Sequence, residues 1–324
     1  MASLDDKSRA SFTSKHYGIA GAHSAVEICL WNKNSLTGKG TCYKEKFYGV
    51  DAHRCAQMSP MVAWCEQNCL HCWRPMEMFR PPSSVSGPFD KPGDIIKGII
   101  EQRRKLLTGF KGNTRVSQER YSEAVEPSHW AISLSGEATL YPMLPELIRE
   151  IKSLPSTRTV FLVTNGQEPR MLQRLADEDA LPTQLYISLI APERRLFGKL
   201  ALPFYKDGWE RLSESLKLWK GFRCRRVLRI TLIRGINDGD AEAEGFASII
   251  SNASPDFVET KSYMHIGYSR HRLERKNMPL MDDVETFTRK MLCHLEGYSL
   301  SGKDETSRIT LLHRDSSLFG LAIA

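Results

Sequence analysis

The cysteines of this 324-residue chain are clustered, since six of the eight lie between Cys29 and Cys72. In a reducing compartment, clustered cysteines bind metal or react more often than they form disulfides. The sequence WCEQNCLHCW has the spacing C-x3-C-x2-C, and an upstream group has the spacing C-x12-C-x12-C. The two triads are Cys65, Cys69 and Cys72, and Cys29, Cys42 and Cys55. We therefore expect two metal sites, whereas Cys224 and Cys293 are expected to be ordinary buried thiols.

Each triad is one ligand short of a closed structural zinc site, which normally has four cysteine or histidine ligands. His71 stands directly beside Cys72 and would struggle to reach the same ion, so zinc would need a distant ligand such as His53, or His23 for the upstream triad. The alternative is a [4Fe-4S] cluster with three irons bound by thiolates and the fourth left open. Catalysis requires an open metal position, so we favour two such clusters and keep zinc as the alternative.

The elements that would position these cysteines begin past residue 57. Apolar runs typical of buried strands alternate there with amphipathic stretches typical of helices. The expected strands are 60–64, 129–135, 159–165, 184–190, 226–233 and 257–265. The expected helices are 93–110, 143–152, 168–177, 208–220, 240–251 and 282–297. This order predicts a parallel sheet built from right-handed βαβ units.

Six such units fall short of the eight in a closed β/α barrel. The expected fold is therefore α/β, a partial (β/α)6 barrel with an open side. The triad in residues 65–72 would follow its first strand, at the edge where β/α sheets place reactive groups. Residues 1–57 hold only one strand-like run, 25–31, and are expected to form an N-terminal extension carrying the auxiliary cluster. Residues 58–324 would form the barrel domain, with one compact unit overall.

The chain is moderately basic, with a net charge of +7 and an isoelectric point near 8.9. Simple solubility explains such values equally well. However, lysine and arginine also cluster locally, which favours a polyanionic partner such as RNA because phosphate binding releases counterions. The candidate RNA contacts are Arg225, Arg226, Arg270, Arg272, Arg275 and Lys276. Alternatively, these residues are ordinary solvent-exposed side chains at helix ends and turns.

The C-x3-C-x2-C spacing, with an aromatic His71 before the last cysteine, resembles the signature of radical S-adenosylmethionine (SAM) enzymes. In that family the open iron binds the amino and carboxylate groups of SAM, and the reduced cluster cleaves SAM to a 5′-deoxyadenosyl radical. The segment SGEATLY resembles the family's G-G-E-P motif, although Ser135 replaces a glycine and Ala138 replaces the proline. The resemblance implies SAM contacts from Ser135, Gly136, Glu137, Thr164, Asn165 and Ser188.

The paired triads, with WNKNSLTGKGTCYKEKFYGVDAHRC and YMHIGYSRHRLERKNMP, resemble the 4-demethylwyosine synthases of wybutosine biosynthesis through nearly the whole chain. The resemblance implies a radical SAM lyase that condenses two carbons of pyruvate with the N1-methylguanosine beside the anticodon of tRNA-Phe. In that family a lysine two residues after the second cysteine forms a Schiff base with pyruvate. Here it is Lys44, which is the catalytic candidate, although an isolated lysine at this place would usually be solvated.

The same resemblance implies two [4Fe-4S] clusters, SAM, pyruvate and tRNA-Phe. The sequence lacks the flavodoxin-like domain of some relatives, so a separate flavodoxin- or ferredoxin-like protein would donate electrons to what we expect to be a monomer. No apolar run is long enough to cross a membrane and the first residues carry no secretory signal, so we expect a cytoplasmic protein.

Two alternative functions stay open. They are a radical SAM methylthio- or methyltransferase with an auxiliary cluster that acts on RNA, and a zinc-binding RNA-binding protein.

Overall fold

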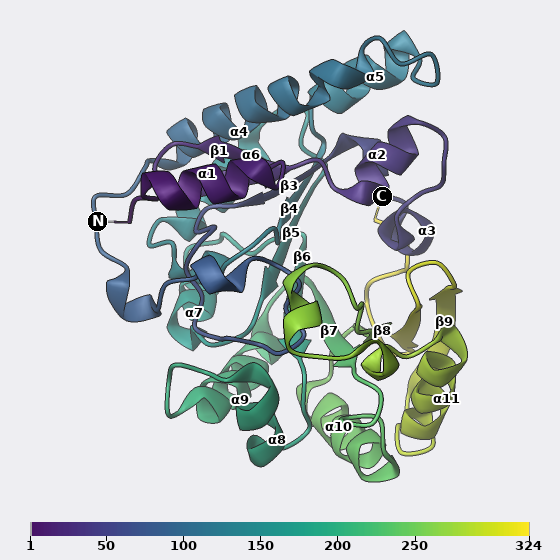
Figure 1. The fold of residues 1–324 in the computed structure, drawn as a ribbon. Coiled ribbons are helices and arrows are strands. Elements are labelled where there is room, and N and C mark those ends of the chain that lie inside the picture. The colour runs from purple at the N-terminus through teal and green to yellow at the C-terminus, as the bar shows by residue number, and fades with distance from the viewer. Residues whose placement is uncertain (1, 324) are drawn as a thin grey trace.

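One sheet of ten strands runs through the computed structural model, which describes residues 2–323 (Figure 1). The strands lie in the order β1-β2-β3-β4-β5-β6-β7-β8-β10-β9. They are β1 (Gly18–Ala20), β2 (Ser24–Glu27), β3 (Cys55–Ser59), β4 (His129–Ile132), β5 (Thr159–Thr164), β6 (Gln184–Leu189), β7 (Arg225–Leu232), β8 (Phe257–Ser262), β9 (Tyr298–Asp304) and β10 (Ile309–Arg314). Strands β3 to β8 are parallel to one another, and antiparallel strands extend both edges of the sheet.

At least one helix follows each parallel strand. The helices are α1 (Asp6–Ser14), α2 (Leu30–Leu36), α3 (Tyr43–Tyr48), α4 (Pro92–Leu107), α5 (Gln118–Val125), α6 (Leu144–Ser153), α7 (Pro169–Asp177), α8 (Arg194–Ala201), α9 (Gly208–Leu218), α10 (Asp240–Ala253) and α11 (Met281–Leu292). The six βα units confirm the expected partial barrel. The connection after β6 holds two helices, and the first of them, α8, was not expected.

The two faces of the sheet carry different cores because successive side chains along a strand point to opposite sides. Leu162, Ile187 and Ile230 belong to the large cluster that includes the buried side chains of the helices. Their neighbours Phe161 and Tyr186 belong to a second cluster on the opposite side, which we call the inner face. The side chains of α3 and the residues near the C-terminus pack onto this inner face.

The first parallel strand is β3, and not residues 60–64 as expected. That apolar segment is fully buried, but it forms turns, and its backbone is held by loop contacts such as Val62 N to His23 O at 3.0 Å. Burial explains its apolar composition, since periodicity alone does not separate a short buried strand from a buried loop. The cysteine triad therefore follows the strand after a longer connection than expected.

The N-terminal segment shares the main core of the barrel. Phe12, Tyr17 and Val26 belong to the same cluster as the barrel strands. Strand β2 pairs with β3, and β3 also spans residue 57, where the extension was expected to end. The division into extension and barrel stays a prediction, but these contacts tie the two parts together.

Three further points concern the chain as a whole. Cys224 is buried as expected, whereas the prediction for Cys293 is wrong because this thiol is exposed at the end of α11. Among residues 2–323, no helix combines the length and the apolar character that a membrane span needs. The last described residues return to α3, where Ile323 N donates to Tyr48 O at 2.9 Å (Figure 1).

Asp256 joins three segments around the start of β8. Its carboxylate is fully buried and accepts hydrogen bonds from the guanidinium groups of Arg226 and Arg314 and from Ser317 Oγ. Burial alone would raise the pKa of this carboxyl, but the hydrogen bonds from Arg226 and Arg314 hold it below its ordinary value. The aspartate is therefore charged and paired in the folded protein.

Asp256→Ala is expected to lower the free energy of unfolding by about 3–5 kcal/mol, because it leaves buried guanidinium groups without a counter-charge. Urea unfolding followed by circular dichroism measures this change. Glu296→Ala removes an exposed carboxylate and should change stability by less than about 0.5 kcal/mol. Equal effects of the two substitutions would contradict the stabilising role of the Asp256 carboxylate.

Candidate active site

The loop with Cys65, Cys69 and Cys72 is held in place by two neighbouring segments. Residues 200–204 pair with its backbone, and Leu70 N donates to Leu200 O at 2.9 Å. From the other side, Arg272 donates to the carbonyl oxygens of Leu70 and Cys72 and forms an ion pair with Glu77 at 2.6 Å. These contacts fix a loop that has no regular structure of its own.

The upstream triad is positioned by three element ends. Cys29 and Cys42 are the residues before the first turns of α2 and α3, and Cys55 begins β3. Arg103 is fully buried and donates to the Cys55 carbonyl oxygen at 2.8 Å and to the His53 carbonyl oxygen at 2.9 Å. The two triads therefore lie at opposite ends of β3, which spans roughly 13–17 Å at the usual rise per residue.

The donor set fits iron-sulfur clusters. All eight cysteines are free thiols, and burial raises the pKa of each triad thiol, to about 12 for Cys42 and about 11 for Cys55. Metal coordination offsets this cost because the ligand binds as a thiolate. Within the described part of the chain, no three His, Cys, Asp or Glu side chains are close enough to share one metal ion. In a [4Fe-4S] cluster, by contrast, each thiolate binds a different iron.

Of the two histidines that a zinc site would recruit, His23 has partners on both ring nitrogens, whereas His53 has one on Nε2 and none on Nδ1. His23 uses both ring nitrogens, with Nδ1 bonded to Pro60 O at 2.6 Å and Nε2 accepting from Asp90 N at 2.9 Å. His53 Nε2 lies 2.7 Å from a Glu123 carboxylate oxygen. The zinc alternative therefore has no free ligand in His23.

The ends of β4 and β5 meet at the C-x3-C-x2-C loop. Glu137 is buried, and its carboxylate accepts from Thr139 N at 3.1 Å, Thr139 Oγ1 at 2.8 Å and Asn165 N at 2.9 Å. Asn165 also donates through Nδ2 to Glu66 Oε2 at 3.0 Å and lies 3.7 Å from Cys65 Sγ. Three segments far apart in the sequence thus converge on one polar cluster.

Gly136 permits this convergence because its backbone packs directly against the loop. A Cβ atom at this position would lie 2.0 Å from Met61 O and 2.7 Å from Trp64 O, and the residue has a φ of +67°. Glycine is the residue that tolerates such a conformation and such a close approach. Of the other predicted SAM contacts, Thr164 is buried beside Glu137, whereas Ser188 lies on β6 opposite Arg229 of β7.

Several buried polar atoms at this cluster have no partner in the protein. They are Glu66 Oε1, Ser135 Oγ and Gln167 Oε1. Unsatisfied buried polar atoms are uncommon and often mark a place that a ligand or water completes. The free atoms, the three thiols and the buried carboxylates together fit a cluster with a polar, cationic organic ligand.

Lys44 reaches from α3 onto the inner face of the sheet. Its Nζ lies 4.5 Å from the ring centre of Phe161 and 4.8 Å from that of Tyr186. Burial lowers the pKa of this amine, and the nearby positive charge of Arg229 lowers it further. A desolvated amine beside another cation is the arrangement that activates a lysine for attack on a carbonyl.

Three charged residues that were not among the predicted site residues lie beside Lys44. Arg229 donates to Glu259 at 2.9 Å and to Tyr43 Oη at 2.6 Å, and Glu259 also accepts from Tyr48 Oη at 2.8 Å. Burial lowers the pKa of Lys261, also on β8, to about 8. These residues could have been found from the sequence, because charged side chains inside otherwise apolar strands must find partners when the strands are buried.

The predicted RNA contacts separate into two groups. Arg225 and Arg226 are buried: Arg225 donates to Gln184 and to the Gly320 and Leu321 carbonyl oxygens, and Arg226 pairs with Asp256. Their assignment to phosphate is corrected, because their donors already serve the protein. Arg272 likewise holds the cysteine loop.

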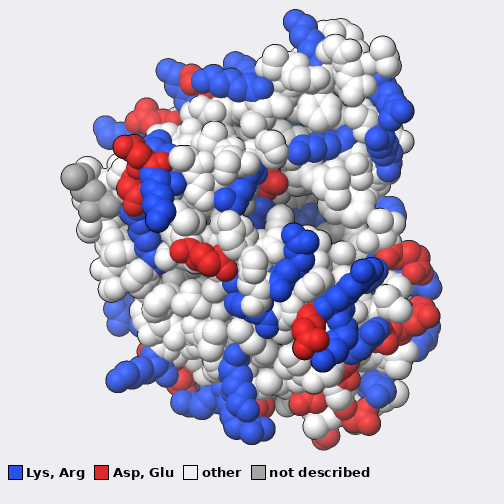
Figure 2. Space-filling view, viewed as in Figure 1, with Lys and Arg blue, Asp and Glu red and all other residues white. Residues whose placement is uncertain are grey.

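The remaining candidates, Arg270, Arg275 and Lys276, are exposed. They belong to the short turns Gly267–His271 and Arg275–Asn277. Figure 2 shows lysine and arginine side chains around a hollow in the middle of the molecule, and these turns border it in the view of Figure 1. This surface is suited to a polyanion.

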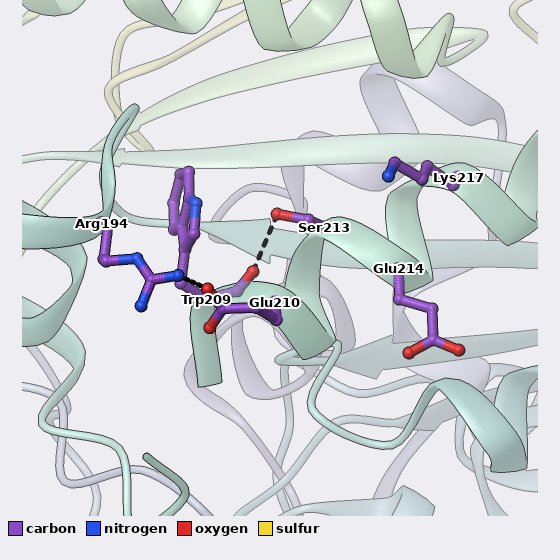
Figure 3. Close-up of a pocket in the computed structure, with 6 residues that line it drawn as sticks. All are labelled: Arg194, Trp209, Glu210, Ser213, Glu214 and Lys217. Atoms are coloured by element: carbon purple, nitrogen blue, oxygen red, sulfur yellow. Dashed lines mark hydrogen bonds and ion pairs between the residues drawn. The ribbon is translucent and has the colours of Figure 1, made fainter. Parts of the chain in front are cut away.

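A separate shallow hollow lies on the outer helices α8 and α9 (Figure 3). It is lined by Arg194, Trp209, Glu210, Ser213, Glu214 and Lys217. Arg194 forms an ion pair with Glu210, and Ser213 Oγ donates to Trp209 O at 2.8 Å. None of these residues belongs to the predicted site, and the hollow is distinct from the inner face.

Comparison with known families and structures extends these observations. Residues 59–244 match the radical SAM superfamily, and residues 252–314 match a family described as wyosine base formation. A structure titled as TYW1 with a lysine-pyruvate adduct bound matches with a TM-score of 0.85 and 33% identity over 97% of both chains. A crystal structure of archaeal TYW1 matches with a TM-score of 0.79, at 31% identity over 98% of this chain and 99% of the other.

Two archaeal relatives carry the name S-adenosyl-L-methionine-dependent tRNA 4-demethylwyosine synthase. The protein of Pyrococcus abyssi is 45% identical over 94% of this chain and 87% of its own length. That of Methanocaldococcus jannaschii is 37% identical over 93% of this chain and 94% of its own length. A radical SAM methyltransferase from Sphaerobacter thermophilus, 17% identical with a TM-score of 0.53 over 74% of this chain and 63% of its own, shares the fold alone. The chain therefore belongs to the radical SAM superfamily and, within it, to the tRNA 4-demethylwyosine synthase family.

Proposed function

We propose that this chain is a radical SAM lyase that makes 4-demethylwyosine in tRNA-Phe during wybutosine biosynthesis. It would condense two carbons of pyruvate with the N1-methylguanosine beside the anticodon and release the first carbon of pyruvate. The observation that carries the proposal is the partly buried Lys44 amine, which lies over Phe161 and Tyr186 of the inner face, two residues from Cys42 of the upstream triad. The titled lysine-pyruvate adduct of a structural relative supports the same role.

The proposed chemistry of Lys44 is Schiff-base formation. Its neutral amine attacks the ketone carbon of pyruvate, and loss of water gives an iminium bond. Phe161 and Tyr186 cover the amine and limit its contact with water, which favours both the neutral amine and the retention of the iminium. Because the adduct is covalent, pyruvate would stay fixed while the tRNA base approaches.

We further propose that each cysteine triad holds one [4Fe-4S] cluster. Cys65, Cys69 and Cys72 would hold the cluster that binds SAM, and the upstream triad would hold the auxiliary cluster. When bound, SAM and the first cluster would supply a 5′-deoxyadenosyl radical. Ser135, Gly136, Glu137, Thr164 and Asn165 would orient SAM beside the loop. Ser188 points to the inner face from β6 and is proposed as a contact farther from the loop.

The tRNA would approach along the basic surface of Figure 2. Its target base lies in a loop, so it can be extruded into the site without unwinding a long helix. Arg270, Arg275 and Lys276 are the proposed phosphate contacts. A separate flavodoxin- or ferredoxin-like electron donor and a monomeric state remain predictions.

Anaerobic reconstitution with iron and sulfide, followed by incubation with methylated tRNA-Phe, SAM, pyruvate and a reductant, tests the proposed function. Mass spectrometry of the digested tRNA should detect the tricyclic base only when pyruvate is present. A methylated or methylthiolated base formed without pyruvate would support the transferase alternative. Zinc without iron or sulfide in the purified protein would contradict both radical mechanisms.

Lys44→Ala is expected to abolish the pyruvate adduct that borohydride reduction traps, because the proposal assigns the attacking amine to Lys44 and not to its neighbour Lys261. Intact-protein mass spectrometry measures the adduct, and SAM cleavage to 5′-deoxyadenosine should persist. Lys39→Ala is the matched control because Lys39 is exposed and lies five residues upstream. A full adduct yield or full turnover with Lys44→Ala would show that Lys44 does not have this role.

Replacing one triad with serine is expected to remove about half of the iron while the other cluster stays intact. The variant lacking the thiols of Cys29, Cys42 and Cys55 should still cleave SAM. The variant lacking those of Cys65, Cys69 and Cys72 should not. Iron and sulfide analysis measures the two clusters, and loss of all iron from either triple variant would contradict separate sites.

Gly136→Ala is expected to displace the loop after β3 and to destabilise the protein by about 1–3 kcal/mol, because the new Cβ meets two backbone oxygens. Iron retention at the SAM site should fall with it. Gly198→Ala is the control, since its Cβ would meet no atom within 4 Å. Unfolding and iron analysis compare the two, and identical behaviour would refute the close approach.

A further inference from the structure

Glu66, inside the C-x3-C-x2-C loop, is a buried carboxylate for which the proposed reaction has so far given no role. Its side chain is fully buried between Cys65 and Asn165. Oε2 accepts from Asn165 Nδ2 at 3.0 Å, whereas Oε1 has no partner. Burying a carboxylate with a free oxygen is costly unless a donor or a cation completes it.

Glu66 and Glu137 form an unusual pair. Asn165 bridges them, since its backbone N donates to Glu137 and its side-chain Nδ2 donates to Glu66. Within residues 2–323 neither carboxylate forms an ion pair with a lysine, arginine or histidine. When both carboxylates are ionised, their negative charge has no balancing lysine, arginine or histidine among the described residues.

The free acceptors indicate what kind of group would balance this charge. Glu66 Oε1 lacks a partner and, when ionised, can only accept, whereas the unpartnered Ser135 Oγ can donate or accept. A hydrogen-bond donor that also carries positive charge would satisfy both atoms and balance the carboxylates. Of the polar groups of SAM, the sulfonium is positive but has no hydrogen to donate, and the carboxylate would be repelled. The amino group supplies N–H donors whether it is free or bound to a metal.

We propose that Glu66 is a second acidic contact for the amino group of SAM, acting together with Glu137. The inference rests on the proposed SAM-dependent function and adds a residue that the motif resemblance did not include. In this arrangement Glu137 is largely engaged by Thr139 and Asn165, and Glu66 provides the unoccupied oxygen. Asn165 fixes the distance between the two carboxylates.

The proposal can be tested by comparing two ligands, with and without the amino group, on the reconstituted holoprotein and its Glu66 variant. Equilibrium dialysis under anaerobic conditions would measure the dissociation constants of S-adenosylhomocysteine and of its analogue without the amino group. Glu66→Gln should weaken binding of S-adenosylhomocysteine about tenfold or more, the usual loss for a hydrogen bond to a charged group. The same substitution should change binding of the deaminated analogue by less than about twofold.

Glu214→Gln is the matched control, because it removes one carboxylate from the exposed surface of α9 (Figure 3). Iron and sulfide analysis of each variant checks that the clusters are retained. Equal weakening of both ligands by Glu66→Gln, or no weakening of either, would overturn the role of Glu66. Failure of the unaltered holoprotein to bind S-adenosylhomocysteine or SAM would instead contradict the proposed function itself.

Discussion

The buried ion pair between Arg229 and Glu259 connects the two halves of the site. Both residues lie on the inner face of the parallel sheet, and both bind tyrosines of α3. Cys42 and Lys44 stand at the start of the same helix. The pair thus helps to set where the upstream cysteine triad and the proposed catalytic amine lie relative to the strands that carry the other cysteine loop. Breaking such a pair is expensive because it strands a charge in the interior.

The repeating part of the fold was predictable because its signal is local. Continuous apolar strands alternating with amphipathic helices specify parallel βαβ units, and the six units are present. The edge strands were not predictable in the same way. In strand β9 at the sheet edge, half-buried Tyr298, Leu300 and Gly302 alternate with exposed polar side chains, and this short pattern contains too few apolar residues to stand out in the sequence. Residues 60–64 were wrongly predicted to be a strand, because this buried loop has the apolar composition of one.

Sequence reasoning names candidate residues where chemistry and spacing coincide, as for the six clustered cysteines, Glu137 and Lys44, and their roles stay predictions. Arginines show the limit of that reasoning. Composition treats Arg225, Arg226, Arg270 and Arg272 alike, yet three of them hold backbone carbonyls or a buried carboxylate and one faces solvent. Glu66 was overlooked for a similar reason. A single acid between two cysteines carries no pattern, and only its unpartnered oxygen distinguishes it.

The C-terminal residues cover one end of the barrel. Phe319, Leu321 and Ile323 pack on the inner-face cluster beside α3, near the ends at which the parallel strands begin. Apolar contacts and Arg225 close that end, whereas the polar cluster around Asn165 lies where the strands finish. The end at which the parallel strands begin is therefore closed by protein. In the proposed reaction, pyruvate and the tRNA base would both have to enter from the end where the strands finish, so the bound base would block the exit of pyruvate.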